Sequence, residues 1–490
     1  KLGADHDLTV LAGWNIEDQV YKTLTVSRTG FVTPNKPSFS LMNGVAENPT
    51  AGGNAWSYVG AFYRVNYGYK GKYLVEVSGR YDGSSKFPIH SKWGFFPSAS
   101  VAWRISDEPW MGWSRRALDN AKIRLSAGSM GNGNVDPYSY TSEMTVATAS
   151  DIVLGGGLPS YTTVGSTVPV SLTWEKSTTY DLGLDLDFLN NRLSFSGDYY
   201  RRYTTDMYTP SISLPSVYGT TSPKGNNAEL RTTGWELSLT WRDSFKLGGK
   251  PFDYSIKAMV WDNRTVVTKY ENATRSLGTL KGYIQNGGSP SDFYEGMELG
   301  EMWGYTVAGL FRDQADIDAW PKQSFGDVEP GDIKYLDLNG DGVVDSYDVK
   351  PIGYTAIPEI VYGFGFSLQW KAFDFSAFFQ GVGHVNFSTR TDQTQGFIAR
   401  NSREANLFSD VYDNYWTPER LDAKYPRLFI GTNNNNNQNS SFWMANGRYM
   451  RLKNLEIGYT LPKHISQKMA MQNMRVYLSG VNLLDRKSVV

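Results

Sequence analysis

Hydrophobic and polar residues alternate along much of the chain with a period of two, in segments about ten residues long. The clearest such segments are residues 73–81, 180–188, 235–241 and 364–370. In the second of them, Tyr180, Leu182 and Leu184 alternate with Asp181 and Asp185. Because successive residues of a strand point to opposite faces of a sheet, each segment predicts a β-strand with one apolar and one polar face. This pattern is typical of a membrane β-barrel and also of a soluble β-sandwich.

The connections between these segments distinguish the two architectures. Very short joints occur at residues 69–71, 190–191 and 371–372, and long ones at residues 131–173, 208–226, 264–301 and 386–448. Short turns at one rim and long loops at the other are typical of an outer-membrane barrel, whereas such long unstructured loops are uncommon in compact soluble domains. The sequence therefore predicts an all-β protein: a transmembrane antiparallel β-barrel with short periplasmic turns and long extracellular loops. About fourteen strands and two short helices, at residues 107–117 and 462–471, are expected.

The composition agrees with a membrane barrel and excludes several other classes of protein. The 490 residues include 48 Lys and Arg against 49 Asp and Glu, a net charge of −1, so the basic excess typical of nucleic-acid binding is absent. Only 20% of the residues are charged, whereas 14% are aromatic, an unusual balance for a soluble domain. The chain contains no cysteine, which excludes disulfide scaffolds, thiolate zinc sites and cysteine nucleophiles.

One acidic segment, residues 337–348, matches the template of a calcium-binding loop, D-x-N-x-D-G-x-x-D-x-x-D. The predicted oxygen ligands are Asp337, Asn339, Asp341, the backbone carbonyl of Val343, Asp345 directly or through water, and Asp348 at the twelfth position, which is usually Glu. An all-oxygen set of this kind favours Ca²⁺, with Mg²⁺ as the alternative. Because amphipathic helices do not flank the segment, the ion is expected to have a structural role. The other interpretation is an acidic turn without a metal.

Enzymatic chemistry has little support in the sequence, and no catalytic residues are predicted. Zincin, Walker A and dinucleotide-binding motifs do not occur. Ser129 lies in A-G-S-M-G, which departs from the nucleophile elbow at its first position. Asp181, Asp185 and Asp187 alternate along one strand face, so we interpret them as the hydrated lining of a lumen and not as a pair of glycosidase carboxylates.

Several long motifs resemble a known family. They are residues 71–88 (GKYLVEVSGRYDGSSKFP) with 93–98 (WGFFPS), 122–134 (KIRLSAGSMGNGN) with 137–140 (PYSY), the acidic stretch 331–353, 448–462 (RYMRLKNLEIGYTLP) and 475–484 (RVYLSGVNLL). Together they resemble the barrel signature of SusC/RagA-type TonB-dependent transporters. The resemblance covers almost all of residues 1–490, which are expected to be a fragment of the barrel domain that lacks the plug domain and the final strands.

The resemblance implies active import of a nutrient, an oligosaccharide or an oligopeptide, across a bacterial outer membrane. It implies a barrel of about 22 strands that is filled by an N-terminal plug and surrounded by outer-membrane lipid. It also implies two protein partners. A SusD-like surface lipoprotein would close over the mouth of the barrel, and the TonB-ExbB-ExbD complex would supply energy through the plug.

Two alternatives stay open at this point: a passive porin with an unplugged lumen, and a secreted, calcium-stapled carbohydrate-binding β protein. In a transporter, loop aromatics would be available to stack on sugar rings or peptide side chains, although packing within the loops is the favoured interpretation for any single one of them. These aromatics are Tyr138, Tyr140, Trp416 and Trp443. The asparagine run at residues 433–437 is expected to be a flexible, solvent-exposed loop. The substrate-binding residues remain unknown from the sequence.

Overall fold

The structure of the chain is a computed structural model that describes most of its residues. The residues outside the description are 1–2, 4, 31, 34, 36–37, 143, 150–151, 166–167, 169–171, 211–216, 218–223, 271–292, 391–406, 430, 432 and 488–490. The chain divides into two compact units. One comprises Lys1–Val101, Ser126–Thr179 and Thr204–Ala228, and the other Ala102–Leu125, Tyr180–Tyr203 and Glu229–Val490. Within the described residues, no helix has the length and apolar character needed to cross a membrane.

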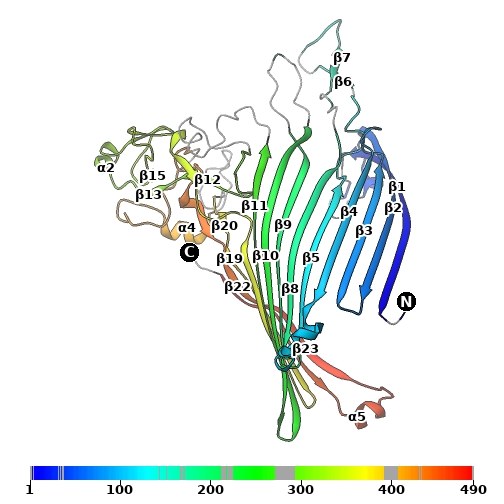
Figure 1. The fold of residues 1–490 in the computed structure, drawn as a ribbon. Coiled ribbons are helices and arrows are strands. Elements are labelled where there is room, and N and C mark those ends of the chain that lie inside the picture. The colour runs from blue at the N-terminus through cyan, green and yellow to red at the C-terminus, as the bar shows by residue number, and fades with distance from the viewer. Residues whose placement is uncertain are drawn as a thin grey trace. The chain divides into compact units, whose positions relative to one another are not determined.

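A 13-stranded sheet dominates the described chain (Figure 1). Its order is β1-β2-β3-β4-β5-β8-β9-β10-β11-β18-β19-β22-β23, so each strand pairs with the members of the sheet that precede and follow it in sequence. The bounds are β1 His6–Arg28, β2 Ala46–Tyr69, β3 Tyr73–Ser84, β4 Trp93–Arg104, β5 Leu118–Asn132, β8 Glu175–Phe188, β9 Leu193–Pro210, β10 Lys224–Leu247, β11 Lys250–Tyr270, β18 Glu359–Trp370, β19 Phe373–His384, β22 Tyr449–Thr460 and β23 Arg475–Lys487. The described registers in this sheet are antiparallel. The predicted all-β, antiparallel architecture is confirmed.

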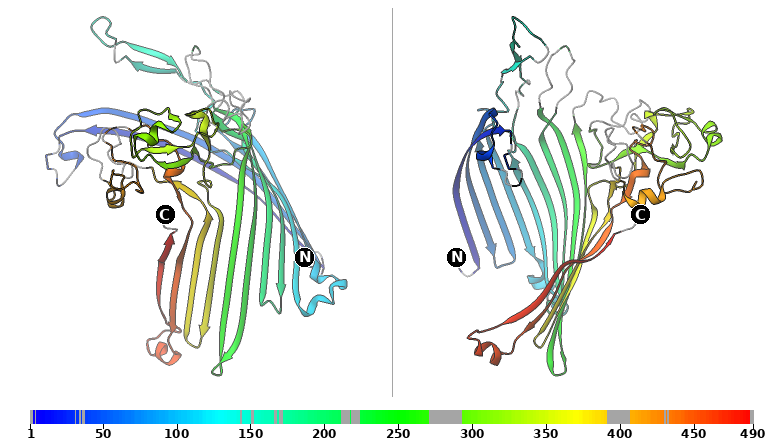
Figure 2. Two further views of the ribbon diagram at one scale, coloured as in Figure 1. Left: turned by 90° about the vertical axis from the view of Figure 1, so that its left-hand side faces the viewer. Right: turned by 180° about the vertical axis from the view of Figure 1, so that it is seen from behind.

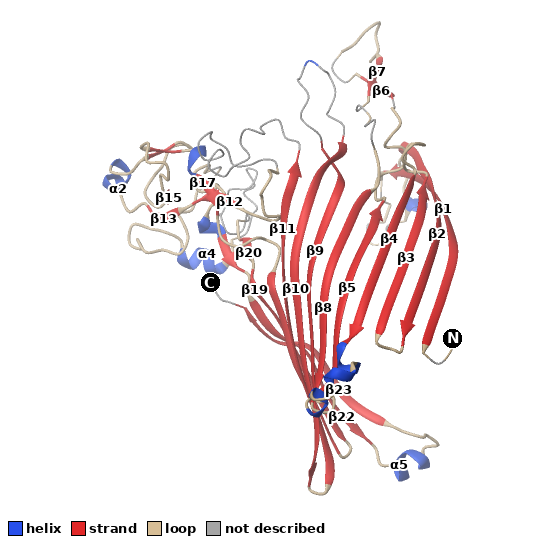
Figure 3. Cartoon of the chain, in the orientation of Figure 1, coloured by secondary structure: helices blue, strands red, loops and turns tan. Residues whose placement is uncertain are grey.

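The remaining elements are short and lie in the connections. The strands are β6 Met144–Thr148, β7 Ser160–Val164, β12 Trp303–Tyr305, β13 Val307–Leu310, β14 Lys322–Gln323, β15 Ile333–Tyr335, β16 Val343–Val344, β17 Val349–Pro351, β20 Asn386–Ser388 and β21 Met444–Asn446. The helices are α2 Gln314–Asp318, α4 Ser409–Asn414 and α5 Lys463–Lys468, and the 3₁₀ turns are η1 Phe39–Leu41, η2 Ile105–Asp107, η3 Pro109–Met111, η4 Ser114–Arg116, η7 Ser346–Asp348 and η9 Ser441–Trp443. Figure 3 shows how little of the chain is helical. The β6–β7 hairpin extends away from the long strands (Figure 2).

The predicted short joints are tight turns between paired strands. The β18–β19 turn contains only Lys371 and Ala372, and Lys371 adopts a positive φ of 56°. In the β8–β9 turn, Asn190 and Asn191 both have positive φ, 60° and 59°. Asparagine tolerates this left-handed conformation better than most residues, which suits it to a hairpin turn whose twist matches that of the strands. The prediction of short turns at one rim is confirmed.

The two faces of the sheet differ in polarity as the alternation predicts. On β8, Tyr180, Leu182 and Leu184 are 54%, 49% and 36% exposed, whereas Asp181 and Asp185 are half-buried on the other face. A row of exposed apolar side chains is unfavourable in water, but it is the normal surface of a strand that faces lipid. The apolar face of β8 therefore suits a membrane environment.

The prediction of a helix at residues 107–117 is wrong, whereas the second helix is confirmed. Residues 105–116 form the three separate 3₁₀ turns η2, η3 and η4. Pro109 lacks a backbone N–H, which interrupts helical hydrogen bonding, and Gly112 has a low helix propensity. In contrast, α5 occupies Lys463–Lys468 within the predicted stretch 462–471.

The prediction of a loop at residues 264–301 places the boundary of the strand too early. β11 continues to Tyr270, because its last residues pair with a returning segment: the Val267 amide donates to the Met297 carbonyl at 2.9 Å and the Leu299 amide to the Thr265 carbonyl at 2.8 Å. The connection that follows does not end at residue 301 but continues to β18, which begins at Glu359.

The first unit has its own small apolar core, which lies between β4 and the connection from β5 to β8. Phe87, Phe96, Val135, Leu172 and Trp174 are buried there, and three tyrosines pack against them. The Phe87 and Trp174 rings lie 4.8 Å apart. This cluster holds the described part of the connection between β5 and β8 against β4.

Candidate functional site

Two long connections of the second unit come together at one end of its strands, opposite α5 (Figures 1 and 2). We name the described residues of 293–358 and 385–448 the rim module. Small two-stranded sheets hold it together: β12 with β17, β13 with β15 and β14 with β16 in the first connection, and β20 with β21 in the second. The two connections also bond to each other, because the Tyr305 amide donates to the Asn439 carbonyl at 2.9 Å. The rim module is therefore one folded body built from two loops.

A buried carboxylate lies at the centre of the contact between the two connections. Asp332 is 0% exposed. Its Oδ1 accepts from Arg427 Nε at 2.7 Å and from the side-chain amides of Asn433 and Asn436 at 2.9 Å each. Its Oδ2 accepts from the Glu329 amide at 2.9 Å. A buried charge is tolerated when it is paired and its lone pairs are used, so Asp332 fastens the two connections together.

The prediction that residues 433–437 form a flexible, exposed loop is wrong. Asn433, Asn435 and Asn436 are 6%, 1% and 2% exposed. Asn435 donates to the Ile333 carbonyl at 2.8 Å and accepts from Gln323 Nε2 at 2.5 Å, and Asn436 Oδ1 accepts from the Ile333 amide at 2.7 Å. An asparagine side chain both donates and accepts hydrogen bonds, so the run is able to satisfy backbone groups in the interior. The asparagines form the polar core of the rim module.

The predicted calcium loop, residues 337–348, lies in the same module. Its acidic side chains accept hydrogen bonds from amides within the loop: Asp337 from Gly340 and Gly342 at 2.6 and 2.8 Å, Asp341 from Val343 at 2.9 Å, Asp345 from Tyr347 at 2.8 Å, and Asp348 from Leu338 at 2.7 Å. The Gly342 and Gly340 amides hold the pKa of the Asp337 carboxyl below its usual range. Gly342 has a positive φ of 87°, as the predicted sharp turn requires.

The predicted calcium ligands lie in two parts of the loop. Asp337, Asn339 and Asp341 surround the first turn, where Asn339 Oδ1 accepts from the Asp341 amide at 2.9 Å. Asp348 is buried and, with Asp345, forms the capping box of η7. In the part of the chain that the structure describes, no group of three or more His, Cys, Asp or Glu side chains is arranged to hold a metal ion. Calcium binding by Asp337, Asn339, Asp341, Val343, Asp345 and Asp348 stays a prediction.

A cavity of about 700 Å³ opens where the rim module joins β11 and β18. Its charged lining is five carboxylates and one guanidinium: Asp262, Glu295, Glu298, Glu301, Glu359 and Arg264. Arg264 Nη2 pairs with Glu298 Oε2 at 2.7 Å, and the Tyr294 hydroxyl donates to Glu301 Oε1 at 2.9 Å. The remaining excess of negative charge gives this cavity an attractive field for cations.

The polar face of β5, β8 and β9 contains an ion-pair network. Arg124 Nε lies 2.8 Å from Asp185 Oδ2, and its Nη2 lies 2.9 Å from Asp198 Oδ1. Ser196 also donates to Asp185 at 2.8 Å, and Asn120 donates to Asp187 at 3.0 Å. Because Asp185 and Asp187 are engaged in these contacts, they are structural polar groups of this face of the sheet; that they line a lumen stays a prediction.

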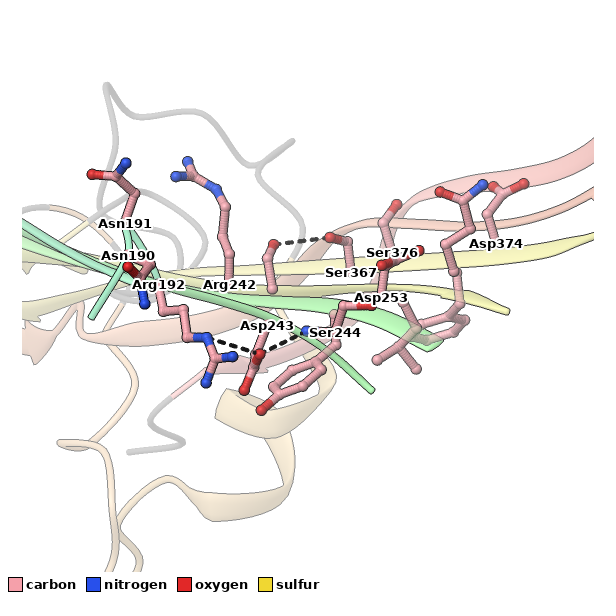
Figure 4. Close-up of a pocket in the computed structure, with 15 residues that line it drawn as sticks. Asn190, Asn191, Arg192, Arg242, Asp243, Ser244, Asp253, Ser367, Asp374 and Ser376 are labelled. Atoms are coloured by element: carbon pink, nitrogen blue, oxygen red, sulfur yellow. Dashed lines mark hydrogen bonds and ion pairs between the residues drawn. The ribbon is translucent and has the colours of Figure 1, made fainter. Parts of the chain in front are cut away.

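A second hollow, of about 660 Å³, lies near the short-turn end of β10, β11, β18 and β19 (Figure 4). Arg192 Nε lies 3.3 Å from Asp243 Oδ1, and Ser255 and Ser367 share a hydrogen bond of 3.0 Å. Arg242 points away from Arg192 and Asp243 in Figure 4. The hollow is thus a hydrophilic surface that is able to form hydrogen bonds with polar groups of another polypeptide segment.

Of the four loop aromatics considered for stacking on a substrate, two are buried. Trp443 is 2% exposed and donates to the Asn436 carbonyl at 2.9 Å, and Trp416 is 8% exposed. Tyr140 packs against the apolar core of the first unit. Tyr138, at 46% exposure, presents its ring to solvent. The favoured interpretation of packing within the loops is confirmed for Trp416, Trp443 and Tyr140.

Sequence reasoning missed the two residues that tie the rim module together, Asp332 and Arg427. They are 95 positions apart, and although Asp332 lies in the acidic stretch 331–353, nothing in that stretch indicates its pairing with Arg427. The only local signal is Pro330-Gly331 before Asp332, which predicts a turn but not a buried carboxylate.

Known proteins resemble the chain along its length. A family model described as "TonB dependent receptor-like, beta-barrel" matches residues 1–483. TonB-dependent receptor P3 of Formosa agariphila is 30% identical over 485 residues, which cover 98% of this chain and 46% of that protein. TonB-dependent receptor SusC of Bacteroides thetaiotaomicron is 27% identical over 418 residues, which cover 82% of this chain and 38% of that protein.

Among solved structures, the RagAB peptide transporter matches the chain with a TM-score of 0.77 at 21% identity, covering 100% of this chain and 50% of that one. At this level of identity the match establishes a shared fold. The chain spans about half the length, or less, of the relatives that it matches.

Proposed function

The chain belongs to the family of TonB-dependent receptor-like β-barrels, outer-membrane receptors and transporters that are not enzymes, and from this premise we propose that it serves the active import of a nutrient. Residues 1–490 would lie within the barrel domain of a SusC/RagA-type importer. The substrate would be an oligosaccharide or an oligopeptide. The observation that supports this proposal is a two-faced antiparallel sheet whose long connections fold into the rim module at one end.

Two partners belong to the proposal. A SusD-like surface lipoprotein would contact the long-loop end of the barrel, where the rim module offers a folded surface in place of flexible loops. The TonB-ExbB-ExbD complex would supply energy from the short-turn end, through a plug domain. The hydrophilic hollow lined by Asp253, Gln369 and Asp374 supports the second contact, because its polar side chains are able to hydrogen-bond to a protein segment inside the barrel.

Uptake by cells tests the proposal directly. The gene for the full-length protein is deleted and restored in its own host, and uptake of labelled oligosaccharide and oligopeptide mixtures is measured with and without TonB. We expect deletion to abolish uptake of one of the two substrate classes, restoration to recover it, and loss of TonB to abolish it again. A protein that continues to admit the substrate without TonB would be a passive pore, and a deletion that changes uptake of neither class would contradict nutrient import.

We also propose that residues 337–348 bind a structural Ca²⁺ ion. The loop supports this because its carboxylates are already held in place by amides, which leaves their remaining lone pairs for a hard cation. The ion would stabilise the closed form of the loop. At a Ca²⁺ concentration about 100 times Kd, the gain is about 2.7 kcal/mol, equivalent to about 100-fold slower proteolysis when cleavage follows the population of the open form.

The measurement is limited proteolysis of the full-length protein in detergent, with cleavage within residues 327–353 followed in Ca²⁺ and in chelator. The double variant Asp337→Ala/Asp341→Ala is expected to be cleaved rapidly in both conditions. Asp327→Ala serves as the matched control, because Asp327 is an exposed carboxylate outside the motif, and it is expected to keep the protection by Ca²⁺. Equal cleavage of the wild type with and without chelator would rule out the metal.

A further inference from the structure

The lipid-facing surface of β8, β9 and β10 changes character along the strands. Towards the short turns it is apolar, with Leu182 and Leu184 on β8 and Leu237 and Leu239 on β10 all exposed. Towards the long loops it becomes aromatic. Tyr180 of β8 is 54% exposed and makes an edge contact with Tyr203 of β9, with ring centroids 6.3 Å apart. This order is typical of a strand that passes from hydrocarbon into the headgroup region.

An arginine lies within this aromatic patch. Arg201 is exposed, and its Nη2 donates to the Tyr199 hydroxyl at 3.5 Å. The guanidinium also interacts with the Tyr203 hydroxyl. Since Tyr203 touches Tyr180, Arg201 and its two tyrosines share the lipid-facing side of the strand. Among the described residues, no carboxylate forms an ion pair with Arg201.

The neighbouring strand places a second arginine beside the first. Arg242 donates its amide to the Arg192 carbonyl at 2.7 Å, and a Cβ on Gly197 would lie 3.1 Å from Leu237 Cδ2. The register defined by these two contacts places Arg231 opposite Tyr203 and diagonal to Arg201. Arg231 is exposed and likewise has no acidic partner in the described part of the chain. Glu229, two residues along β10, pairs with Lys269 Nζ at 3.5 Å.

The depth of the two arginines agrees with the headgroup region. Arg201 follows Leu193, the first residue of β9, by eight positions. At about 3.3 Å per residue and a tilt of about 40°, it lies roughly 20 Å above the short turns, near the upper edge of an apolar band about 25 Å tall. From this depth a guanidinium reaches the lipid phosphates when its long side chain extends toward the membrane surface.

We propose that Arg201 and Arg231, with the hydroxyls of Tyr199 and Tyr203, form a binding site for the phosphate of an anionic lipid headgroup in the outer leaflet. Two guanidinium groups and two hydroxyls on adjacent strands of one face provide several N–H and O–H donors, and guanidinium groups are well suited to binding phosphate. The site rests on the outer-membrane location of the sheet and is independent of the substrate that the protein imports.

The test measures lipid retained by the full-length protein. The protein is placed in bilayer nanodiscs of equal parts phosphatidylglycerol and phosphatidylcholine, extracted stepwise with detergent, and its remaining lipids are quantified by mass spectrometry. We expect the wild type to retain phosphatidylglycerol preferentially, by about fivefold for each arginine, the factor for one basic side chain at an anionic membrane surface. The variant Arg201→Gln/Arg231→Gln should retain the two lipids equally.

Arg202→Gln is the matched control. Arg202 is adjacent to Arg201 but lies over the Tyr200 ring, 5.9 Å from its centroid, on the other face, so its loss should leave the lipid preference unchanged. Heat-modifiable electrophoretic mobility verifies that each variant is a folded barrel. Equal retention of both lipids by the wild type would refute the site even if the double variant failed to assemble. The proposal would also fail if Arg202→Gln lost the preference.

Discussion

Replacing Asp332 by Ala is expected to destabilise the rim module by about 3–5 kcal/mol, the usual cost of leaving one partner of a buried ion pair without its counter-charge. Asp332 is fully buried and accepts from Arg427, Asn433 and Asn436. Its removal leaves two buried amides without their acceptor and leaves the Arg427 guanidinium with only the exposed Glu329 as an ion-pair partner. Because these donors belong to the second connection, the loss should separate the two connections while the strands stay paired.

Hydrogen–deuterium exchange of the full-length protein measures this effect locally. We expect faster exchange at residues 331–336 and 433–437, and unchanged exchange in β8 and β9. Glu329→Gln is the matched control, because Glu329 pairs with the same arginine, Nη1 to Oε2 at 3.0 Å, but its side chain is 63% exposed, and exposed pairs contribute at most about 1 kcal/mol.

A second variant separates the electrostatic cause from a packing defect. In Asp332→Ala/Arg427→Met the orphaned charge is removed together with its partner, so protection should return in part. If Asp332→Ala exchanges at the wild-type rate, the carboxylate does not fasten the two connections. If the double variant is no better than the single one, packing around residue 332 and not the buried charge determines the stability of the module.

Introducing Arg at Leu184 is expected to cost about 2–4 kcal/mol in barrel stability, provided that this position faces the middle of the bilayer. Leu184 lies on the exposed apolar face of β8, between Tyr180 near one rim and Phe188 beside the short turn. A guanidinium there must be desolvated or must deform the bilayer to reach water. The measurement is the fraction of folded, heat-modifiable protein in isolated outer membranes.

Gln369→Arg provides the comparison for that experiment. Gln369 lines the polar hollow with Asp253 and Asp374, so the same side chain added there should be tolerated. Leu184→Phe, which keeps the face apolar, should also assemble normally. Normal assembly of Leu184→Arg would mean that this face of β8 does not contact lipid.

The strands and short turns could be predicted from the sequence because their physical causes are local. A period of two between Tyr180 and Phe188 is sufficient to define a strand and its apolar face, and Asn190-Asn191 supplies the backbone conformation of the turn. The error at residues 107–117 is local as well. The segment has the apolar and basic residues of an amphipathic helix, but Pro109 and Gly112 divide it into single turns.

The rim module could not be predicted because its stability depends on pairs far apart in sequence. Residues 433–437 are all asparagine. Such a polar run suggests solvent exposure, because the sequence does not show which buried groups could form hydrogen bonds with it. Their partners are the backbone of Ile333 and the carboxylate of Asp332, about a hundred positions earlier. Within the rim module, only the acidic loop at residues 337–348 could be recognised from the sequence, because its hydrogen bonds join residues of one twelve-residue segment.

The strand order has a consequence for how the protein folds. Since each strand of the sheet pairs with the one before it, the chain is able to assemble one hairpin at a time, with little loop entropy lost at the tight turns. The three exceptions, which must close long loops, are the step from β5 to β8 and the two steps whose connections form the rim module, from β11 to β18 and from β19 to β22. A rim module that condenses early would bring these strand ends together, so the slowest steps of folding are expected where the two connections must first find each other.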